Sequence, residues 1–184
     1  MARLNLTFQT CKPDVDETPL QGESAAQLVE RLSIAKARDA KNHFDSGLVI
    51  GSDQVCIIDD EILGKPGNYD NAMRQLQHAS GKTVRFLTGL CLYDIENDRE
   101  QTLVEPFDVV FRQLSDQQLT HYLKTEQPYQ CAGSFKSEGL GITLFEKLDG
   151  EDPNTLIGLP MIQLVNLFSN WDIDVLSAQS GVTP

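Results

Sequence analysis

The chain has few basic residues for its acidic content. Fifteen lysines and arginines stand against 27 aspartates and glutamates, which gives the 184 residues a net charge of −12. This shortage argues against a nucleic-acid polymer or an anionic membrane as the partner, because both need a basic face. A small-molecule nucleotide could still bind where local lysines and a divalent cation overcome the overall repulsion.

The chain also lacks a hydrophobic run as long as a membrane span, and its first 30 residues contain no hydrophobic signal core. Its four cysteines lie far apart and form no Cys-x-x-Cys pair or Cys/His cluster, which argues against a zinc site. They could form two disulfides, but Cys56 and Cys91 lie inside apolar, strand-like runs, where buried free thiols are common. We therefore expect a reduced, cytoplasmic protein.

No internal repeat, low-complexity tract or linker rich in proline, glycine or serine interrupts the chain. A hydrophobic content of 40% with 23% charged residues is typical of a globular chain rather than a disordered one. A length of 184 residues suits one domain with a hydrophobic core. We expect a single domain over residues 1–184, with a frayed, polar tail after about Ser177.

Capping patterns and apolar spacing predict four helices. Ser24 with Gln27, and Ser115 with Gln118, each place a capping serine three residues before a glutamine. Pro160 is typical of a first helical turn. The expected helices cover about 25–40, 71–79, 116–126 and 160–168.

Runs rich in β-forming residues, separated by polar turns, predict the strands. Runs 83–93 and 101–111 should pair antiparallel, and 56–58 with 62–63 should form a hairpin around the turn residues Asp59-Asp60. Further strands are expected at 48–50 and 139–145. Because strands alternate with helices while some form hairpins, we expect an α/β fold with a mixed, partly antiparallel sheet and flanking helices.

The most informative stretch is Gly51-Ser52-Asp53-Gln54, which follows the apolar run Leu48-Val49-Ile50. This pattern predicts a strand that ends and presents the Asp53 carboxylate at its carboxyl edge, where open α/β sheets bind ligands. Twelve residues after Asp53, the motif Gly64-Lys65-Pro66 holds a lysine on a short, stiff support. A carboxylate for a metal and a lysine for a phosphate indicate phosphate-ester or anhydride chemistry. The alternative interpretation is that Asp53 caps a turn and Lys65 is a solvated loop residue.

Three further segments could contact a ligand. Asp14-Val15-Asp16-Glu17 is an acidic loop before the first helix, although such loops are usually only solvated. Residues 131–139 combine glycines and serines with Lys136 and Glu138, and could cradle a ligand through backbone N–H groups. Asp152-Pro153-Asn154-Thr155 leads towards a helix N-terminus, where anions are favoured. No one of these segments is specific by itself.

The order of the motifs along the chain is specific. They are Asp16-Glu17, Ala35-Lys36-Ala37, Gly51-Ser52-Asp53-Gln54, Gly64-Lys65-Pro66, Ala132-Gly133-Ser134-Phe135-Lys136-Ser137-Glu138-Gly139 and Gly158-Leu159-Pro160. Together they resemble the Maf family of nucleoside triphosphate pyrophosphatases, over about residues 3–170. The resemblance implies a fold related to inosine triphosphate pyrophosphatases, with a cleft between two lobes. It also implies a divalent cation, Mg²⁺ or Mn²⁺, and a homodimer.

The same resemblance assigns roles to individual residues. Asp53 would be a metal ligand and the base for the attacking water, and Glu17 would help to hold the cation. Lys36 and Lys65 would neutralise phosphate charge, and Lys136 would bind substrate. Without the resemblance, Lys36 would be interpreted as an ordinary lysine on a helix surface.

Gln54 and Glu138 indicate the branch of the family. The pyrimidine-directed branch has threonine and glutamine at these positions, whereas Gln54 with Glu138 resembles the branch that hydrolyses 7-methyl-GTP. A carboxylate accepts both the N1–H and the exocyclic amine of a guanine edge. Methylation at N7 makes the base cationic, which strengthens its attraction to Glu138 and to an aromatic face. Phe135 is the nearest aromatic candidate, although it fits a core position equally well.

The N-terminus departs from the family pattern. The family opens with a strand and a Ser-x-Ser-x-x-Arg phosphate loop, whereas this chain begins Met1-Ala2-Arg3-Leu4-Asn5. We expect a truncated or misassigned start, and a folded chain of reduced activity. Two alternatives to a 7-methyl-GTP pyrophosphatase are a nucleotide-binding or regulatory protein with little turnover, and a pyrophosphatase for another triphosphate such as dTTP or UTP.

Overall fold

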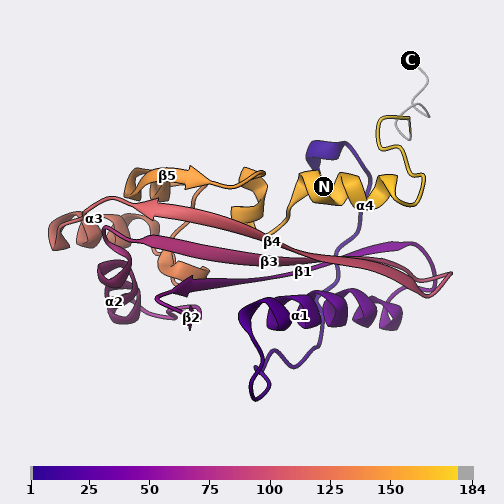
Figure 1. Cartoon of the computed structure of the whole chain (residues 1–184), viewed down its shortest axis with the longest axis horizontal. Helices are drawn as coiled ribbons and strands as arrows, with labels where there is room; N and C mark the ends of the chain where they lie inside the picture. The colour runs from indigo at the N-terminus through magenta and orange to yellow at the C-terminus, as the bar shows by residue number, and fades with distance from the viewer. Residues whose placement is uncertain (1, 178–184) are drawn as a thin grey trace.

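The computed structural model describes residues 2–177, which are built around a five-stranded sheet (Figure 1). The strands lie in the order β2-β1-β3-β4-β5, and each described pairing is antiparallel. The predicted α/β class is confirmed. The sequence predicted a mixed, partly antiparallel sheet, and the five described strands pair only in the antiparallel sense. Their bounds are Leu48–Ile58 for β1, Glu61–Leu63 for β2, Thr83–Asp94 for β3, Arg99–Phe111 for β4 and Phe145–Asp149 for β5.

Four α-helices flank the long strands. Helix α1 lies along one face of β1 and β3, and α4 lies on the opposite face, whereas α2 and α3 lie together at the other end (Figure 1). The long strands therefore connect two groups of helices, α1 with α4 at one end and α2 with α3 at the other, as expected for a two-lobed molecule. The helices are α1 (Ala25–Asp39), α2 (Tyr69–Ala79), α3 (Asp116–Glu126) and α4 (Met161–Ser169).

Local capping explains where these helices begin. The Ser24/Gln27 and Ser115/Gln118 capping boxes are both formed, which confirms the predicted starts of α1 and α3. Helix α2 begins at Tyr69, two residues before the predicted start, because the Asn68 side chain accepts a hydrogen bond from the backbone N–H of Asn71. No helix in the described part of the chain is long and apolar enough to cross a membrane.

Strand β1 is longer than predicted. The expected end after Ile50 is wrong, because β3 pairs continuously with residues 48–57 and so extends the ladder through the Gly-Ser-Asp stretch. Asp53 pairs with Gly89 in mid-strand and is not at a carboxyl edge. Strand β2, however, pairs only with residues 56–58 of β1. Within the described chain Asp53 therefore lies in a part of β1 that has a neighbouring strand on one side only.

The strand predicted at 139–145 is also wrong. Residues Leu140–Leu144 form a short 3₁₀ helix, η4, and β5 begins only at Phe145. The cause is a tight approach of the backbone to itself. A Cβ on Gly141 would lie 2.2 Å from the carbonyl oxygen of Lys136, a fold-back that an extended strand cannot make. The predicted frayed tail lies outside the described residues except for Ser177.

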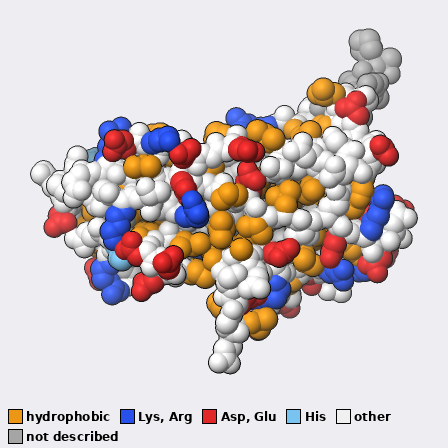
Figure 2. All heavy atoms as spheres, viewed as in Figure 1, with side chains coloured by type: hydrophobic (Ala, Val, Ile, Leu, Met, Phe, Trp, Pro, Cys, Tyr) orange, Lys and Arg blue, Asp and Glu red, His pale blue; other side chains and the backbone are white. Residues whose placement is uncertain are grey.

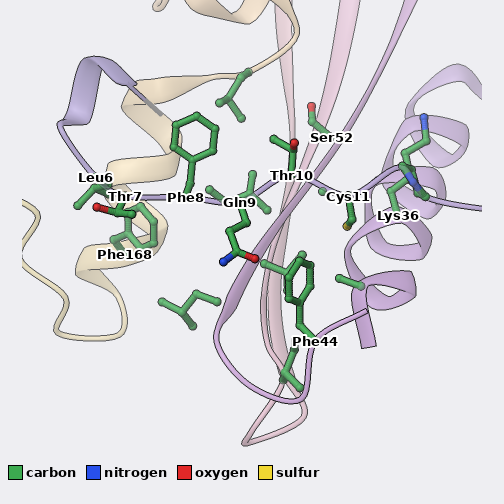
Figure 3. A pocket seen from close by; sticks show the side chains of 18 of the residues that line it. Leu6, Thr7, Phe8, Gln9, Thr10, Cys11, Lys36, Phe44, Ser52 and Phe168 are labelled. Atoms are coloured by element: carbon green, nitrogen blue, oxygen red, sulfur yellow. The ribbon is translucent and has the colours of Figure 1, made fainter. Parts of the chain in front are cut away.

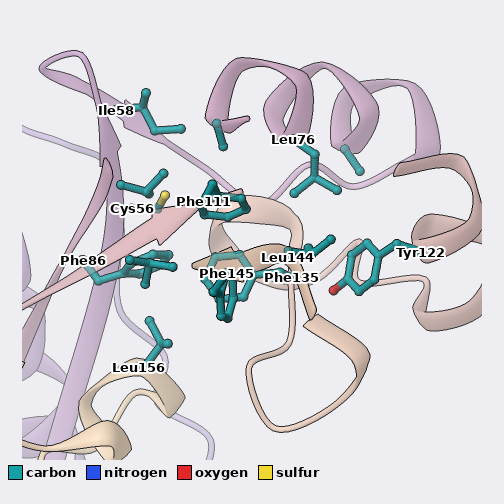
Figure 4. Close-up of a cluster of buried hydrophobic side chains, with 14 of the residues drawn as sticks. Cys56, Ile58, Leu76, Phe86, Phe111, Tyr122, Phe135, Leu144, Phe145 and Leu156 are labelled. Atoms are coloured by element: carbon teal, nitrogen blue, oxygen red, sulfur yellow. The ribbon is translucent and has the colours of Figure 1, made fainter. Parts of the chain in front are cut away.

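Aromatic side chains fill the largest hydrophobic cluster, shown in Figure 4. Phe135 makes edge-to-face contacts with the rings of Phe86, Phe111 and Phe145, at centroid separations of 4.8–5.6 Å. Phe135 is only 5% exposed, so it belongs to the core. Its position anchors the segment that follows it, which carries Lys136 and Glu138.

The four cysteines are free, and Cys56 and Cys91 are buried as predicted. Burial raises the pKa of the Cys56 thiol to about 12, so this thiol stays protonated and unreactive near neutral pH. On the face shown in Figure 2, acidic and basic side chains are interspersed around a group of hydrophobic side chains. The acidic excess is therefore not gathered into one patch on that face.

Two glycines allow α1 to lie unusually close to the sheet. A Cβ on Gly51 would lie 2.2 Å from the carbonyl oxygen of Ser33, and one on Gly89 would lie 2.1 Å from that of Val29. Both clashes are with helix backbone, which cannot rotate away as a side chain can. The glycines thus set the distance at which side chains of α1 can reach β1.

We expect Gly89→Ala to destabilise the protein by roughly 1–3 kcal/mol, because the added methyl group would push α1 off the sheet. Urea unfolding monitored by circular dichroism measures this change. Gly64→Ala is the matched control, because a Cβ at Gly64 meets nothing within 4 Å. Equal stability losses in the two variants would contradict close packing of α1 as the cause.

Candidate active site

A lysine and two carboxylates form the centre of the candidate site. The Lys36 amine, from the sheet-facing side of α1, lies 2.6 Å from Oδ1 of Asp53 on β1 and 2.6 Å from Oε1 of Glu17. The side chains of Lys36 and Asp53 are only 16% and 12% exposed, whereas that of Glu17 is 57% exposed. The predicted catalytic aspartate, metal-binding glutamate and phosphate-binding lysine are therefore brought together.

The surroundings separate the two carboxylates chemically. Burial raises the pKa of Asp53 above its ordinary value, and the hydrogen bond from Lys36 only partly opposes this. The same lysine lowers the pKa of the more exposed Glu17. Burial by itself lowers the pKa of Lys36, but its hydrogen bonds to Asp53 and Glu17 raise it overall. Asp53 is therefore the more basic carboxylate, beside a lysine that stays charged.

A cavity of about 320 Å³ opens beside this group. It lies within the size range of small-molecule sites. The predicted residues that line it are Asp53, Gln54, Lys65, Lys136 and Glu138. Lys36 and Glu17 do not line it but join it through their contacts with each other and with Asp53. Five of the seven predicted site residues thus line one cavity, Lys36 contacts one of them, and Glu17 contacts Lys36; the roles of all seven are predictions.

The segment that carries Lys136 and Glu138 is held by α3. The backbone N–H of Lys136 donates to the Tyr122 hydroxyl at 3.1 Å, and that of Leu140 donates to Oε1 of Glu126 at 3.1 Å. Glu138 itself is exposed, and no ion pair forms at Glu138 or Lys65 within the described chain. Both charges are therefore available to a ligand. The backbone around Glu138 is held in place by its hydrogen bonds to α3.

Two alternate residues of β1 clamp a turn that borders the cavity, the 3₁₀ helix η5 (Pro153–Ile157). Oγ of Ser52 lies 2.7 Å from the carbonyl oxygen of Gly158 and 2.8 Å from that of Gly89. Nε2 of Gln54 donates to the carbonyl oxygen of Thr155 at 2.6 Å and to the Thr88 hydroxyl at 2.8 Å. This role for Ser52 was not predicted from the sequence. Ser52 and Gln54 are two residues apart on one strand, so their side chains point to the same face, and this spacing could have indicated it.

A larger cavity of about 930 Å³ adjoins the first, since Ser52 and Gly158 line both. Figure 3 shows Lys36 and Ser52 bordering it, together with Phe8 and Gln9 of the extended N-terminal segment and Phe44. Lys36 lines the larger cavity, and its amine contacts Asp53, which lines the smaller one.

The helix N-terminus after residues 152–155 does not offer the expected anion site. Oδ2 of Asp152 accepts a hydrogen bond from the backbone N–H of Ile162 at 2.8 Å, and Oδ1 accepts one from that of Asn154 at 2.8 Å. The hydrogen bonds lower the pKa of Asp152 overall, although its burial acts to raise it. The protein's own carboxylate therefore caps α4, where an external anion was expected.

A lysine-bridged pair of carboxylates beside a cavity with two further lysines is an arrangement suited to a phosphorylated ligand. The chain belongs to the Maf family: the model described as Maf-like protein matches residues 1–171.

Individual relatives are similar over nearly the whole chain. A 7-methyl-GTP pyrophosphatase of Pseudoalteromonas translucida is 57% identical over 181 residues, which cover 98% of this chain and 90% of the relative. One of Colwellia psychrerythraea is 56% identical over 183 residues, covering 100% and 92%. One of Nitrosococcus oceani is 53% identical over 176 residues, covering 96% and 88%. The predicted family is confirmed.

Proposed function

We propose that the chain hydrolyses the α–β anhydride of 7-methyl-GTP to 7-methyl-GMP and pyrophosphate. The observation that carries the proposal is the placement of the Asp53–Lys36–Glu17 group beside a cavity that Glu138 also lines. The three similar relatives described above bear this activity in their names. The site thus combines lysines that suit the phosphates with a carboxylate that suits a cationic base.

In this proposal Asp53 acts as the general base. Its raised pKa, caused mainly by burial, makes it a better proton acceptor than an ordinary aspartate. It accepts a proton from the attacking water as the new P–O bond forms and the bond to the pyrophosphate leaving group breaks. Lys36 and the exposed Lys65 stabilise the negative charge that accumulates on the phosphate oxygens. Lys36 is only 16% exposed, and its charge therefore acts more strongly than a solvated one.

A divalent cation, Mg²⁺ or Mn²⁺, is part of the proposal. Among the described residues no group of three or more histidine, cysteine, aspartate or glutamate side chains could hold a metal ion by itself. A cation bound by one or two carboxylates together with substrate phosphates fits this donor set. Lys36 contacts only one oxygen of Asp53 and one of Glu17, so the second oxygen of each is a donor for the cation. Such a cation supplies further charge neutralisation when bound.

Base recognition is assigned to Gln54 and Glu138. Because Nε2 of Gln54 already donates to Thr155 and Thr88, its Oε1 atom is the part left for a ligand. Oε1 and the Glu138 carboxylate are both hydrogen-bond acceptors, which match the N1–H and exocyclic amine of a guanine edge. The negative charge of Glu138 adds attraction for the N7-methylated, cationic base.

We expect Glu138→Gln to reduce kcat/KM for 7-methyl-GTP far more than kcat/KM for UTP. Losing one charge-assisted contact costs about 1.5–3 kcal/mol, which is roughly a tenfold to hundredfold change in the ratio. Steady-state pyrophosphate release on both nucleotides measures it. Glu146→Gln, a change in an exposed side chain of β5, is the control. Equal relative losses on the two substrates would show that Glu138 does not read the base.

The proposed activity is tested by incubating the protein with 7-methyl-GTP, GTP, UTP and dTTP in Mg²⁺ or Mn²⁺ and detecting pyrophosphate. The proposal requires the highest kcat/KM on 7-methyl-GTP and loss of turnover when EDTA removes the cation. Preference for UTP or dTTP would favour the pyrimidine alternative. Tight binding of nucleotide by calorimetry, with no pyrophosphate released, would favour the regulatory alternative.

The proposal also includes the setting of the protein. Four free cysteines, two of them buried, fit a reducing compartment, and we place the protein in the cytoplasm. We further propose a homodimer, as the family resemblance implies. Light scattering after size-exclusion chromatography measures the mass in solution, and a value of one chain would refute the dimer.

A further inference from the structure

One amide side chain on α2 contacts two separate loops of the candidate site. Nε2 of Gln75 donates to the carbonyl oxygen of Gly64 at 3.0 Å, and its Oε1 accepts a hydrogen bond from the Ser134 hydroxyl. Gly64 directly precedes Lys65, and Ser134 lies two residues before Lys136. Gln75 is outside the group of residues that line the smaller cavity. It therefore touches the backbone or side chain of both loops without being part of the ligand surface.

The first of these loops, residues 64–67, carries Lys65 and is held by few other contacts. The side chain of Asn71, also on α2, donates to the carbonyl oxygen of Pro66 at 2.8 Å. The backbone N–H of Gly67 donates to the carbonyl oxygen of Tyr129 at 2.9 Å. Both contacts involve residues that follow Lys65 in the chain, whereas Gly64 precedes it. The hydrogen bond from Gln75 to Gly64 thus holds the beginning of the loop, which the contacts at Pro66 and Gly67 do not reach.

The second loop, residues 131–138, makes a tight turn at Ser134. Gly133 and Ser134 both have positive φ, 73° and 62°, and Ser134 is fully buried. A serine in this left-handed region is held there by its surroundings, since it is unfavourable for a residue with a side chain. A Cβ on Gly133 would lie 3.0 Å from the Phe86 ring, so the turn is packed as well as bent. The hydroxyl of Ser134 makes its bond to Gln75 from within this turn.

We infer that Gln75 is a positioning residue that couples the 64–67 loop to the 131–138 loop. Its amide fits this role because one end donates and the other accepts, so each loop is matched to a different atom. The coupling holds the phosphate-binding Lys65 in register with Glu138, which recognises the base, and with Lys136, which binds substrate. These ligand roles rest on the proposed function, whereas the coupling of the loops does not.

Hydrogen–deuterium exchange of the nucleotide-free protein tests the coupling independently of activity. Gln75→Leu should increase exchange in peptides that cover 64–67 and in those that cover 131–138. Ser134→Ala removes only the contact to the second loop, yet it should also increase exchange at 64–67, because Gln75 would lose one of its two anchors. If Ser134→Ala leaves residues 64–67 unchanged, the loops are independent and the inference is overturned.

Kinetics then test the consequence for the ligand. Gln75→Leu should raise KM for 7-methyl-GTP about tenfold with a smaller change in kcat, because the two ends of the ligand are no longer held in register. Gln77→Leu is the matched control on the same helix: it removes a hydrogen bond to Asp116 at 2.8 Å and should leave KM unchanged. Equal KM shifts in the two variants would overturn the positioning role. A wild-type protein without turnover would refute the proposed function, and the exchange experiment would still decide the coupling.

Discussion

Replacing Asp53 with asparagine should lower pyrophosphate release from 7-methyl-GTP by about a hundredfold to ten-thousandfold, the usual contribution of a general base. The substitution keeps the shape of the side chain and its place opposite Gly89 in the β1–β3 ladder. It removes the proton acceptor and one proposed oxygen donor to the cation. Steady-state kinetics in excess Mg²⁺, with circular dichroism to verify the fold, measure the effect.

The pH profile separates a base from a structural residue. In the wild-type protein the rate should fall as the pH drops through the pKa of Asp53, which burial places above the ordinary aspartate value. The residual rate of Asp53→Asn should lack this acidic limb. Asp60→Asn is the matched control: Asp60 lies in the β1–β2 turn with a φ of 67°, a conformation that asparagine also adopts. Near-normal turnover by Asp53→Asn would show that another group accepts the proton.

Local features of the fold could be predicted because their causes lie within a few residues. The Ser24/Gln27 and Ser115/Gln118 capping boxes form as expected, since each is closed by residues three positions apart. The hairpin around Asp59-Asp60 also forms, and both aspartates adopt the positive φ of a tight turn. In each case the sequence pattern and the structure depend on the same short-range contacts.

The environment of Asp53 could not be predicted from its neighbours in sequence. The pattern Gly-Ser-Asp after an apolar triplet indicated the end of a strand, but pairing with β3, thirty to forty residues later, continues the strand. The shortness of β2 also leaves this part of the β1 edge without a neighbouring strand in the described chain. Strand length and edge position are properties of the whole sheet and not of one segment.

Long-range polar contacts were likewise beyond the sequence. Gln54 was predicted to read the base, whereas its amide nitrogen is used to hold Thr155, which is 101 residues away. Gln75 carried no signal in the sequence, because an exposed-looking glutamine on an amphipathic helix is common. Lys36 was singled out only by the family resemblance. Its contact with Asp53 depends on the close approach of α1 that Gly51 and Gly89 permit.

Replacing Lys36 with methionine should reduce kcat/KM by about a hundredfold to a thousandfold, comparable with the loss of a preorganised donor to a developing negative charge. The variant removes the ammonium group that bridges Asp53 and Glu17. It should also move the acidic limb of the pH–rate profile to higher pH, because the hydrogen bond from Lys36 is the main influence that lowers the pKa of Asp53 against its burial. Kinetics between about pH 5 and pH 9 report both effects.

Lys41→Met is the matched control for this experiment. Lys41 is an exposed lysine whose amine pairs with Asp98 at 2.8 Å in the turn between β3 and β4, and it lines neither cavity. Its loss should leave kcat/KM and the pH profile unchanged. Lys36→Arg retains the positive charge and should therefore keep the acidic limb nearer to its wild-type position than Lys36→Met does. If Lys36→Met loses activity without any shift of the limb, Lys36 acts on the phosphates alone, and its contact with Asp53 does not set the basicity of the catalytic carboxylate.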